Sequence, residues 1–215
     1  LYCIFDWNDC IPMLTYAQLQ KLFENKKGKS IQSLKQSNGL DLFYKKVAYN
    51  WLVVSPDDIP TYDEHNKLIA SSGTERIKVI SKWRDILLLL FCGKFYFTKW
   101  LAYGDDFHYT ASDLTEFVYP FDLLTNNEIE TLLSLSQKFK KELPTTLKFK
   151  LNAGKNVGTY NTKALWNLTD ISDKIFLSHM TENVDSIINM IENTVAFSVI
   201  SDRKENNDEL NAGED

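Results

Sequence analysis

The spacing of hydrophobic positions changes near residue 80, and the two parts of the chain predict different elements. Up to that point, short apolar or β-branched runs are separated by glycine, proline and polar residues, a pattern typical of strands and loops. The runs that suggest strands are Leu1–Phe5, Ile11–Leu14, Val47–Val54 and Arg76–Ile80. A helix is expected over Thr15–Asn25, where Leu19, Leu22 and Phe23 share one face. Asp57–Lys67 contains Pro60 and is expected to be a polar loop.

After residue 80 the apolar positions repeat with the period of a helix. Predicted helices cover Trp83–Cys92 with Ser81 as a cap, Lys94–Tyr103 ending at Gly104, Thr125–Leu143, Asp170–Met180 and Thr181–Ile200. Thr125 and Glu128 have the spacing of a capping box, and Pro144 ends the helix that they open. Lys148–Tyr160 is basic and contains two glycines, so it is expected to be loop rather than helix.

The pattern as a whole predicts an α+β fold, with a mixed, strand-containing N-terminal lobe followed by a mostly helical C-terminal lobe. We expect a strand-rich lobe over residues 1–80, a helical lobe with exposed loops over residues 81–200, and a disordered acidic tail over residues 201–215. Because the first residues already suggest a strand, the chain is expected to be part of a longer protein.

Composition narrows the classes of function. The formal net charge is -5 and the pI is about 5.3, which argues against a nucleic-acid binder that acts alone, unless a partner domain supplies further phosphate contacts. The 3 cysteines lack Cys-x-x-Cys spacing, so we expect reduced thiols in a cytoplasmic protein rather than a zinc site. The longest apolar run, Ile86–Cys92, is far shorter than the ~20 residues of a membrane span, and no membrane partner is expected.

Motifs for catalysis are missing from the sequence. None of the 8 glycines forms the Gly-x-Gly turn with which a methyltransferase approaches its cofactor, and there is no Asn/Asp-Pro-Pro-aromatic tetrapeptide. Asp57, Glu64 and Lys67 only faintly suggest a nuclease, because two residues separate the second acid from the lysine in a polar loop. The sequence signal for a metal site is equally weak. Its three neighbouring candidate ligands are Asp105, Asp106 and His108, and we interpret this segment as a turn.

The first informative motif lies in Leu87–Phe117, where an aromatic helix is followed by a tight Gly-Asp turn. It resembles the C-terminal regions of N6-adenine DNA methyltransferases from type II restriction-modification systems. The residues that carry the resemblance are Gly104, Asp105, Phe107, His108, Thr110, Asp113, Leu114 and Phe117. The sequence departs from the family pattern at Asp106, where glycine is frequent, and at Tyr109, where valine is usual.

A second motif lies in Gly154–Leu177 and resembles the same family. Its matching residues are Gly154, Lys155, Val157, Gly158, Tyr160, Asn161, Thr169, Asp170 and Asp173. Lys155 and Lys163 flank a glycine-containing loop whose backbone N–H groups suit phosphate contact; a structural hairpin with solvated lysines is the other interpretation. The resemblance spans about Tyr44 to Leu177.

The resemblance implies that this chain is the target-recognition part of such an enzyme and carries no catalytic residue. It implies that double-stranded DNA and the N-terminal methyltransferase domain of the same protein are the partners. S-adenosylmethionine would be bound by that other domain, with no cofactor in this chain. Base flipping requires a second domain that clamps the duplex.

Candidate DNA-binding residues are Lys94, Lys99, Trp100, Lys155, Asn156, Tyr160, Asn161 and Lys163. Lysines are expected to contact phosphate, asparagines to contact adenine edges, and Trp100 or Tyr160 to support an unstacked base. For Trp100, core packing on the 94–103 helix is the other and favoured interpretation. A supporting turn is expected from Gly104, Asp105, His108 and Thr110. The alternatives are a protein-docking module of a restriction-modification complex and, with less support, a nuclease.

Overall fold

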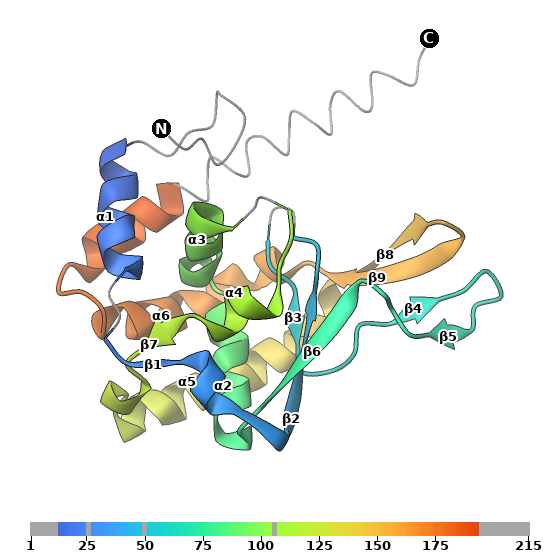
Figure 1. The fold of residues 1–215 in the computed structure, drawn as a ribbon, viewed down its shortest axis with the longest axis horizontal. Helices are drawn as coiled ribbons and strands as arrows, with labels where there is room; N and C mark the ends of the chain where they lie inside the picture. The colour runs from blue at the N-terminus through green and yellow to red at the C-terminus, as the bar shows by residue number, and fades with distance from the viewer. Residues whose placement is uncertain (1–12, 25–26, 49–50, 105–106, 194–215) are drawn as a thin grey trace, which may run out of the picture.

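A computed structural model describes residues 13–24, 27–48, 51–104 and 107–193, and it has the expected α+β class (Figure 1). The α-helices are α1 (Met13–Phe23), α2 (Ser81–Cys92), α3 (Lys94–Tyr103), α4 (Ala111–Thr115), α5 (Asn126–Glu142) and α6 (Trp166–Ser178). Residues 184–193 are also helical. The 3-10 turns are η1 (Ile31–Leu34), η2 (Phe121–Leu123), η3 (Leu143–Thr146) and η4 (Thr162–Leu165).

Nine short strands form three separate antiparallel sheets in the described part of the chain. A two-stranded sheet pairs β1 (Lys29–Ser30) with β7 (Val118–Tyr119). A three-stranded sheet has the order β3 (Val54–Ser55), β2 (Lys35–Lys45), β6 (Thr74–Val79). A four-stranded sheet has the order β5 (Leu68–Ile69), β4 (Thr61–Tyr62), β9 (Lys155–Tyr160), β8 (Leu147–Asn152).

The core is built around α2. All seven residues of Ile86–Cys92 are buried, because a helix that is apolar all round must be covered on every side. Helices α3, α5 and α6 and strand β2 all contact it. Strands β2 and β6 face the same core with Leu42, Tyr44 and Ile77, so the three-stranded sheet and the helices share one hydrophobic interior.

The four-stranded sheet projects from this body, at the right of Figure 1. It combines a hairpin from the first part of the chain with one from the second, since Thr61 pairs with Val157 and Tyr62 pairs with Asn156. Strand β8 is an edge strand, and five of its six residues are exposed. This sheet therefore places two distant segments beside each other, away from the hydrophobic core.

Several predictions of local structure were correct and several were wrong. The α2 and α3 helices and the Thr125–Glu128 capping box of α5 are confirmed, but Ser81 is the first residue of α2 and not its cap, since the N-cap is Ile80. Lys148–Tyr160 is a β-hairpin rather than a loop. Among the described residues of the expected strand Val47–Val54, only Val54 belongs to one of the strands. The predicted strand at residues 1–5 and the predicted tail at residues 201–215 lie outside the described residues.

Among the described helices, none is by itself both long and apolar enough to cross a bilayer. Helices α2 and α3 reach that length only as a pair bent by 66°.

Candidate nucleic-acid interface

The structure separates the eight candidate DNA-binding residues into two groups. Lys94, Lys99 and Trp100 belong to α3, in the helical body. The other five lie on or beside β9, at the projecting sheet, and these are Lys155, Asn156, Tyr160, Asn161 and Lys163. Figure 1 shows α3 within the helical body and the β8–β9 hairpin projecting from it, so the two groups belong to different parts of the fold.

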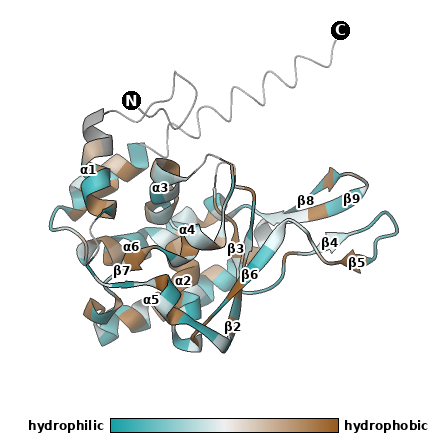
Figure 2. Cartoon of the chain, viewed as in Figure 1, coloured by the Kyte–Doolittle hydropathy of each residue, from teal (hydrophilic) through white to brown (hydrophobic). Residues whose placement is uncertain are grey.

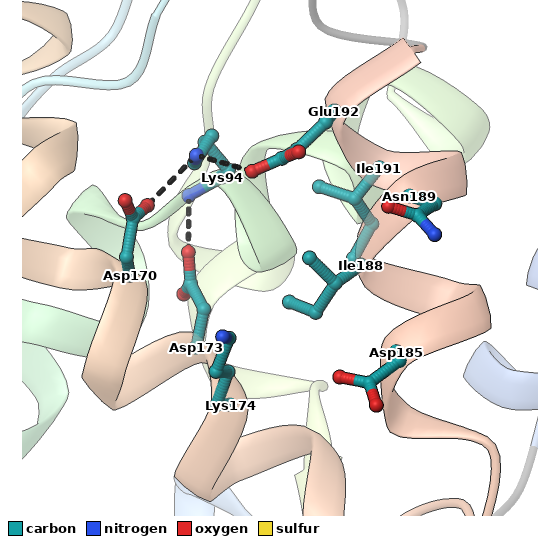
Figure 3. Close-up of a pocket in the computed structure, with 9 residues that line it drawn as sticks. All are labelled: Lys94, Asp170, Asp173, Lys174, Asp185, Ile188, Asn189, Ile191 and Glu192. Carbon is teal, nitrogen blue, oxygen red and sulfur yellow. Dashed lines mark hydrogen bonds and ion pairs between the residues drawn. The ribbon is translucent and has the colours of Figure 1, made fainter.

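Lys94 is held in a network of internal ion pairs. Its Nζ lies 2.7 Å from Asp170 Oδ1 and 3.3 Å from Glu192 Oε1, and its side chain is only 16% exposed (Figure 3). Burial disfavours the charged ammonium, but the two carboxylates outweigh burial and raise the pKa of Lys94. The prediction that Lys94 contacts phosphate is corrected, because the Lys94 ammonium is already paired with two carboxylates.

Asp173 stands beside Lys94 and caps the start of α3. Its Oδ2 accepts the backbone N–H of Lys94 at 3.0 Å and that of Phe95 at 3.4 Å. The residue is buried, and desolvation raises the pKa of its carboxyl to about 8 even though these bonds and Lys94 favour the carboxylate. Asp170 and Asp173, which carry the second motif, thus join α6 to the start of α3 on one wall of a cavity of about 410 Å³.

Trp100 lies in the core with 1% of its surface exposed. Its ring stacks on Phe97, and its Nε1 donates to the His108 carbonyl oxygen at 3.1 Å. No ring face is open to a base, so the predicted role of Trp100 in base support is corrected. Lys99 is half-buried, with Nζ 5.5 Å from the Tyr96 ring centroid, and burial lowers its pKa.

The predicted turn packs against Trp100. A Cβ at Gly104 would lie 2.7 Å from Trp100 Nε1, so only glycine fits the close approach. His108 is exposed and bridges to Val47, while Thr110 forms a capping box with Asp113 at the start of α4. The cap of this short helix is therefore Thr110. Asp105 and Asp106 lie outside the described residues.

At the base of the projecting sheet, three predicted contact residues hold the hairpin to the body. Tyr160 is buried, and its carbonyl oxygen accepts from Trp51 Nε1 at 2.9 Å. Lys163 Nζ lies 5.8 Å from the Trp51 ring centroid, and the Asn161 backbone N–H donates to the Thr146 carbonyl oxygen at 3.1 Å. Burial and the nearby Asp57 raise the pKa of Tyr160. Tyr160 has no ring face open to a base, which corrects its predicted role.

The β8–β9 hairpin carries the exposed positive charge. The register places Lys148, Lys150 and Lys155 on one face of the sheet, and all three are exposed. None of them makes an ion pair with a described residue. From Leu143 to Thr169 there are four lysines and no aspartate or glutamate, against a net charge of -5 for the whole chain.

Lys148 and Lys150 were missing from the predicted contact residues. A signal for them exists in the sequence, because Lys148, Phe149, Lys150 and Leu151 alternate between polar and apolar with the period of a strand. Figure 2 shows the same alternation as hydrophobic and hydrophilic segments side by side in the hairpin. The glycines at 154 and 158 favoured a loop instead.

The residues of the nuclease alternative belong to the neighbouring β4–β5 turn or precede it. Glu64 forms an exposed ion pair with His65 at 3.5 Å, and the backbone N–H of Lys67 donates to Asp63 Oδ1 at 2.8 Å. Within the described ranges, no three His, Cys, Asp or Glu side chains are grouped closely enough to hold a metal ion.

The chain was compared with family models, with curated proteins and with solved structures, and nothing matched it in any of the three.

Proposed function

We propose that this chain binds double-stranded DNA through the lysine face of the β8–β9 hairpin, as the target-recognition part of an N6-adenine DNA methyltransferase. The observation that supports DNA binding is the acid-free stretch from Leu143 to Thr169, folded into a projecting hairpin with three exposed lysines. The assignment to a methyltransferase rests on the two sequence motifs. In this proposal, S-adenosylmethionine and the catalytic residues belong to a separate N-terminal domain.

The spacing of the lysines suits a phosphate backbone. Lys148 and Lys150 are two residues apart on one strand, a separation of about 6.6 Å along it. Each phosphate of one B-DNA strand rises about 3.4 Å along the helix axis and also winds around it, so neighbouring phosphates lie farther apart than this rise, and two lysines at this spacing can contact two of them. Lysine ammonium groups act as point charges toward phosphate and need no fixed orientation.

A gel-shift titration of random duplex DNA against the full chain, at several salt concentrations, tests this proposal. We expect binding that weakens steeply with salt, because each phosphate contact releases a counterion. Changing Lys148, Lys150 and Lys155 together to alanine removes up to three contacts, so the slope of log K against log salt should fall by about 2 to 3.

A matched control is available elsewhere on the surface. Lys21, Lys138 and Lys141 are exposed lysines of α1 and α5, and changing these three to alanine alters the net charge by the same amount. The control variant should keep the wild-type slope. Equal losses in both variants would mean that overall charge matters and the hairpin does not, which would contradict the proposal.

A docking module remains the second candidate, because one observation favours it. The opposite face of the same sheet carries Leu68 at 63% and Leu151 at 70% exposed. Binding to a protein partner through this face would vary little with salt.

A further inference from the structure

A row of side chains crosses the apolar face of the projecting sheet. The register places Leu68 opposite Tyr62, Tyr62 opposite Asn156, and Asn156 opposite Leu151, so these four residues stand side by side across β5, β4, β9 and β8. The Phe149 ring lies beside the row, with its centroid 5.6 Å from that of Tyr62, and Phe149 is 47% exposed. We call these five residues the platform.

The missing side chain at Gly158 leaves room for the Phe149 ring on the face of the sheet. Phe149 stands opposite Gly158, where a Cβ would lie 3.3 Å from Phe149 Cε1 and 2.4 Å from the Pro60 carbonyl oxygen. A residue with a side chain there would displace the ring. The glycine therefore lets an aromatic ring lie low against the sheet with much of its surface open.

Asn156 is the member of the platform that carries a side-chain amide, a group that can both donate and accept hydrogen bonds. Its amide makes no hydrogen bond to any described residue, because its neighbours Tyr62 and Leu151 are largely apolar. A purely apolar partner would bury this amide without a hydrogen bond, which costs about 1–3 kcal/mol. A nucleobase edge offers a donor and an acceptor side by side.

The charge around the platform favours a polyanion. β8 is the edge strand, and Lys148 and Lys150 alternate along it with Phe149 and Leu151, on the opposite face of the sheet. The two acids of the β4–β5 turn are engaged locally, because Asp63 accepts from the backbone N–H of His65 and Glu64 pairs with the His65 ring. Aromatic and aliphatic surface bordered by lysines is the composition of sites that bind unpaired nucleic acid.

We propose that the platform binds an unpaired nucleobase, with the Phe149 ring stacking on its face, the Tyr62 ring contacting it at an angle, and the Asn156 amide bonding its edge. The inference rests on the proposed function, because it gives the same sheet a second DNA ligand, an unpaired base. A flat face cannot stack on a base inside a duplex, so the ligand is a base that has left the stack.

The test compares two labelled single strands of equal length, one oligodeoxyadenylate and one abasic oligomer with the same number of phosphates. Fluorescence anisotropy with the full chain measures the affinity for each. We expect the base-containing strand to bind about tenfold tighter or more, since one stacked base is worth on the order of a factor of ten. Phe149→Leu and Asn156→Leu should each reduce this ratio and leave the abasic affinity unchanged.

Leu123→Ala is the matched control, because Leu123 is an equally exposed apolar residue outside the sheet. It should keep the wild-type ratio. Equal affinities for the two strands in the wild type, or an unchanged ratio in both platform variants, would overturn the inference and leave the face to a protein partner. Salt-sensitive duplex binding that depends on the three lysines would still stand in that case, so the two proposals fail separately.

Discussion

A single carboxyl group, that of Asp173, couples the start of α3 to α6. It accepts two backbone N–H groups at the N-terminus of a helix, where a negative charge is favoured, yet it is fully buried, where a charge is disfavoured. Desolvation is the larger effect and raises its pKa to about 8. The carboxyl group is therefore mostly protonated at neutral pH.

This pKa predicts a dependence of stability on pH. Between the unfolded value of about 3.9 and the folded value of about 8, the folded state holds a proton that the unfolded state has released, so Asp173 makes the free energy of unfolding fall as pH rises. Asparagine has no such proton. Asp173→Asn should therefore gain stability relative to the wild type from pH 4 to pH 8, by on the order of a few kcal/mol, and level off above.

Urea denaturation at a series of pH values measures this difference. Asp185→Asn is the control, since Asp185 lines the same cavity but is exposed. The control should show a flat difference from the wild type. A flat difference for Asp173→Asn as well would show that the buried carboxyl does not titrate as described.

Gly93 provides a second prediction at the scale of the residue. A Cβ at this position would lie 2.1 Å from Asp173 Oδ1, so Gly93→Ala must displace the carboxyl that caps α3. We expect a loss of about 1–3 kcal/mol in the free energy of unfolding, typical of overpacking. Gly73→Ala should cost much less, because the nearest atom to its Cβ is 3.7 Å away. Similar urea midpoints for the two variants would contradict this expectation.

At the scale of the element, the tip of the β8–β9 hairpin is strained. Both residues of its two-residue turn have positive φ, with 48° at Ala153 and 77° at Gly154. Alanine rarely adopts this conformation, whereas Asn-Gly is a favoured pair in such turns. Ala153→Asn should therefore stabilise the hairpin by about 0.5–1 kcal/mol.

Hydrogen exchange of the β8 and β9 amides would measure this change locally. The expected result is slower exchange in both strands with little change in α2. Ala164→Asn, in the 3-10 turn η4, changes the same residue types without a positive φ and should give no such protection. Faster exchange in Ala153→Asn would count against a strained turn.

The elements differ in how well the sequence predicts them. The apolar run Ile86–Cys92 and the Thr125–Glu128 spacing are strong local signals, because burial on all sides and a capping box leave few other conformations. The β8–β9 hairpin was missed because Gly154 and Gly158 are read first as loop formers. Both glycines have strand-related roles, one in the turn and the other beneath the Phe149 ring.

The candidate site was less predictable than the elements, because its residues depend on tertiary partners. Nothing local in the sequence indicates that Lys94 pairs with Asp170, 76 positions away. The burial of Trp100, in contrast, agrees with the core packing expected on its helix. Lys155 and Asn156 do lie on the projecting sheet, as exposed and half-exposed residues. The partner of Asn156 in β4, Tyr62, comes from a segment that was expected to be a loop.

At the scale of the whole molecule, the protection of backbone amides from hydrogen exchange should differ between elements. Helix α2 is enclosed by α3, α5 and α6, whereas β8 is an exposed edge strand of a sheet outside the core. We expect the α2 amides to exchange most slowly and the β8 amides to be among the fastest of the strands. Duplex DNA at saturating concentration should slow exchange in β8 and β9 and leave α2 unchanged.

The α5 amides serve as an internal control for that experiment, since α5 carries the exposed lysines Lys138 and Lys141. If DNA protected α5 as much as the hairpin, binding would be spread over the surface. Protection of α3 alone would instead indicate that DNA binds to the helical body.

The pairing of β4 with β9 also affects how the protein is made. Thr61 cannot pair until Val157, 96 positions later in the chain, has been synthesised. At about 5–20 residues per second, the β4–β5 hairpin spends on the order of 5 to 20 seconds outside the ribosome without its neighbour. During that interval β4 has no partner along the edge that β9 later occupies, so the nascent chain exposes an unpaired strand edge that a chaperone could shield.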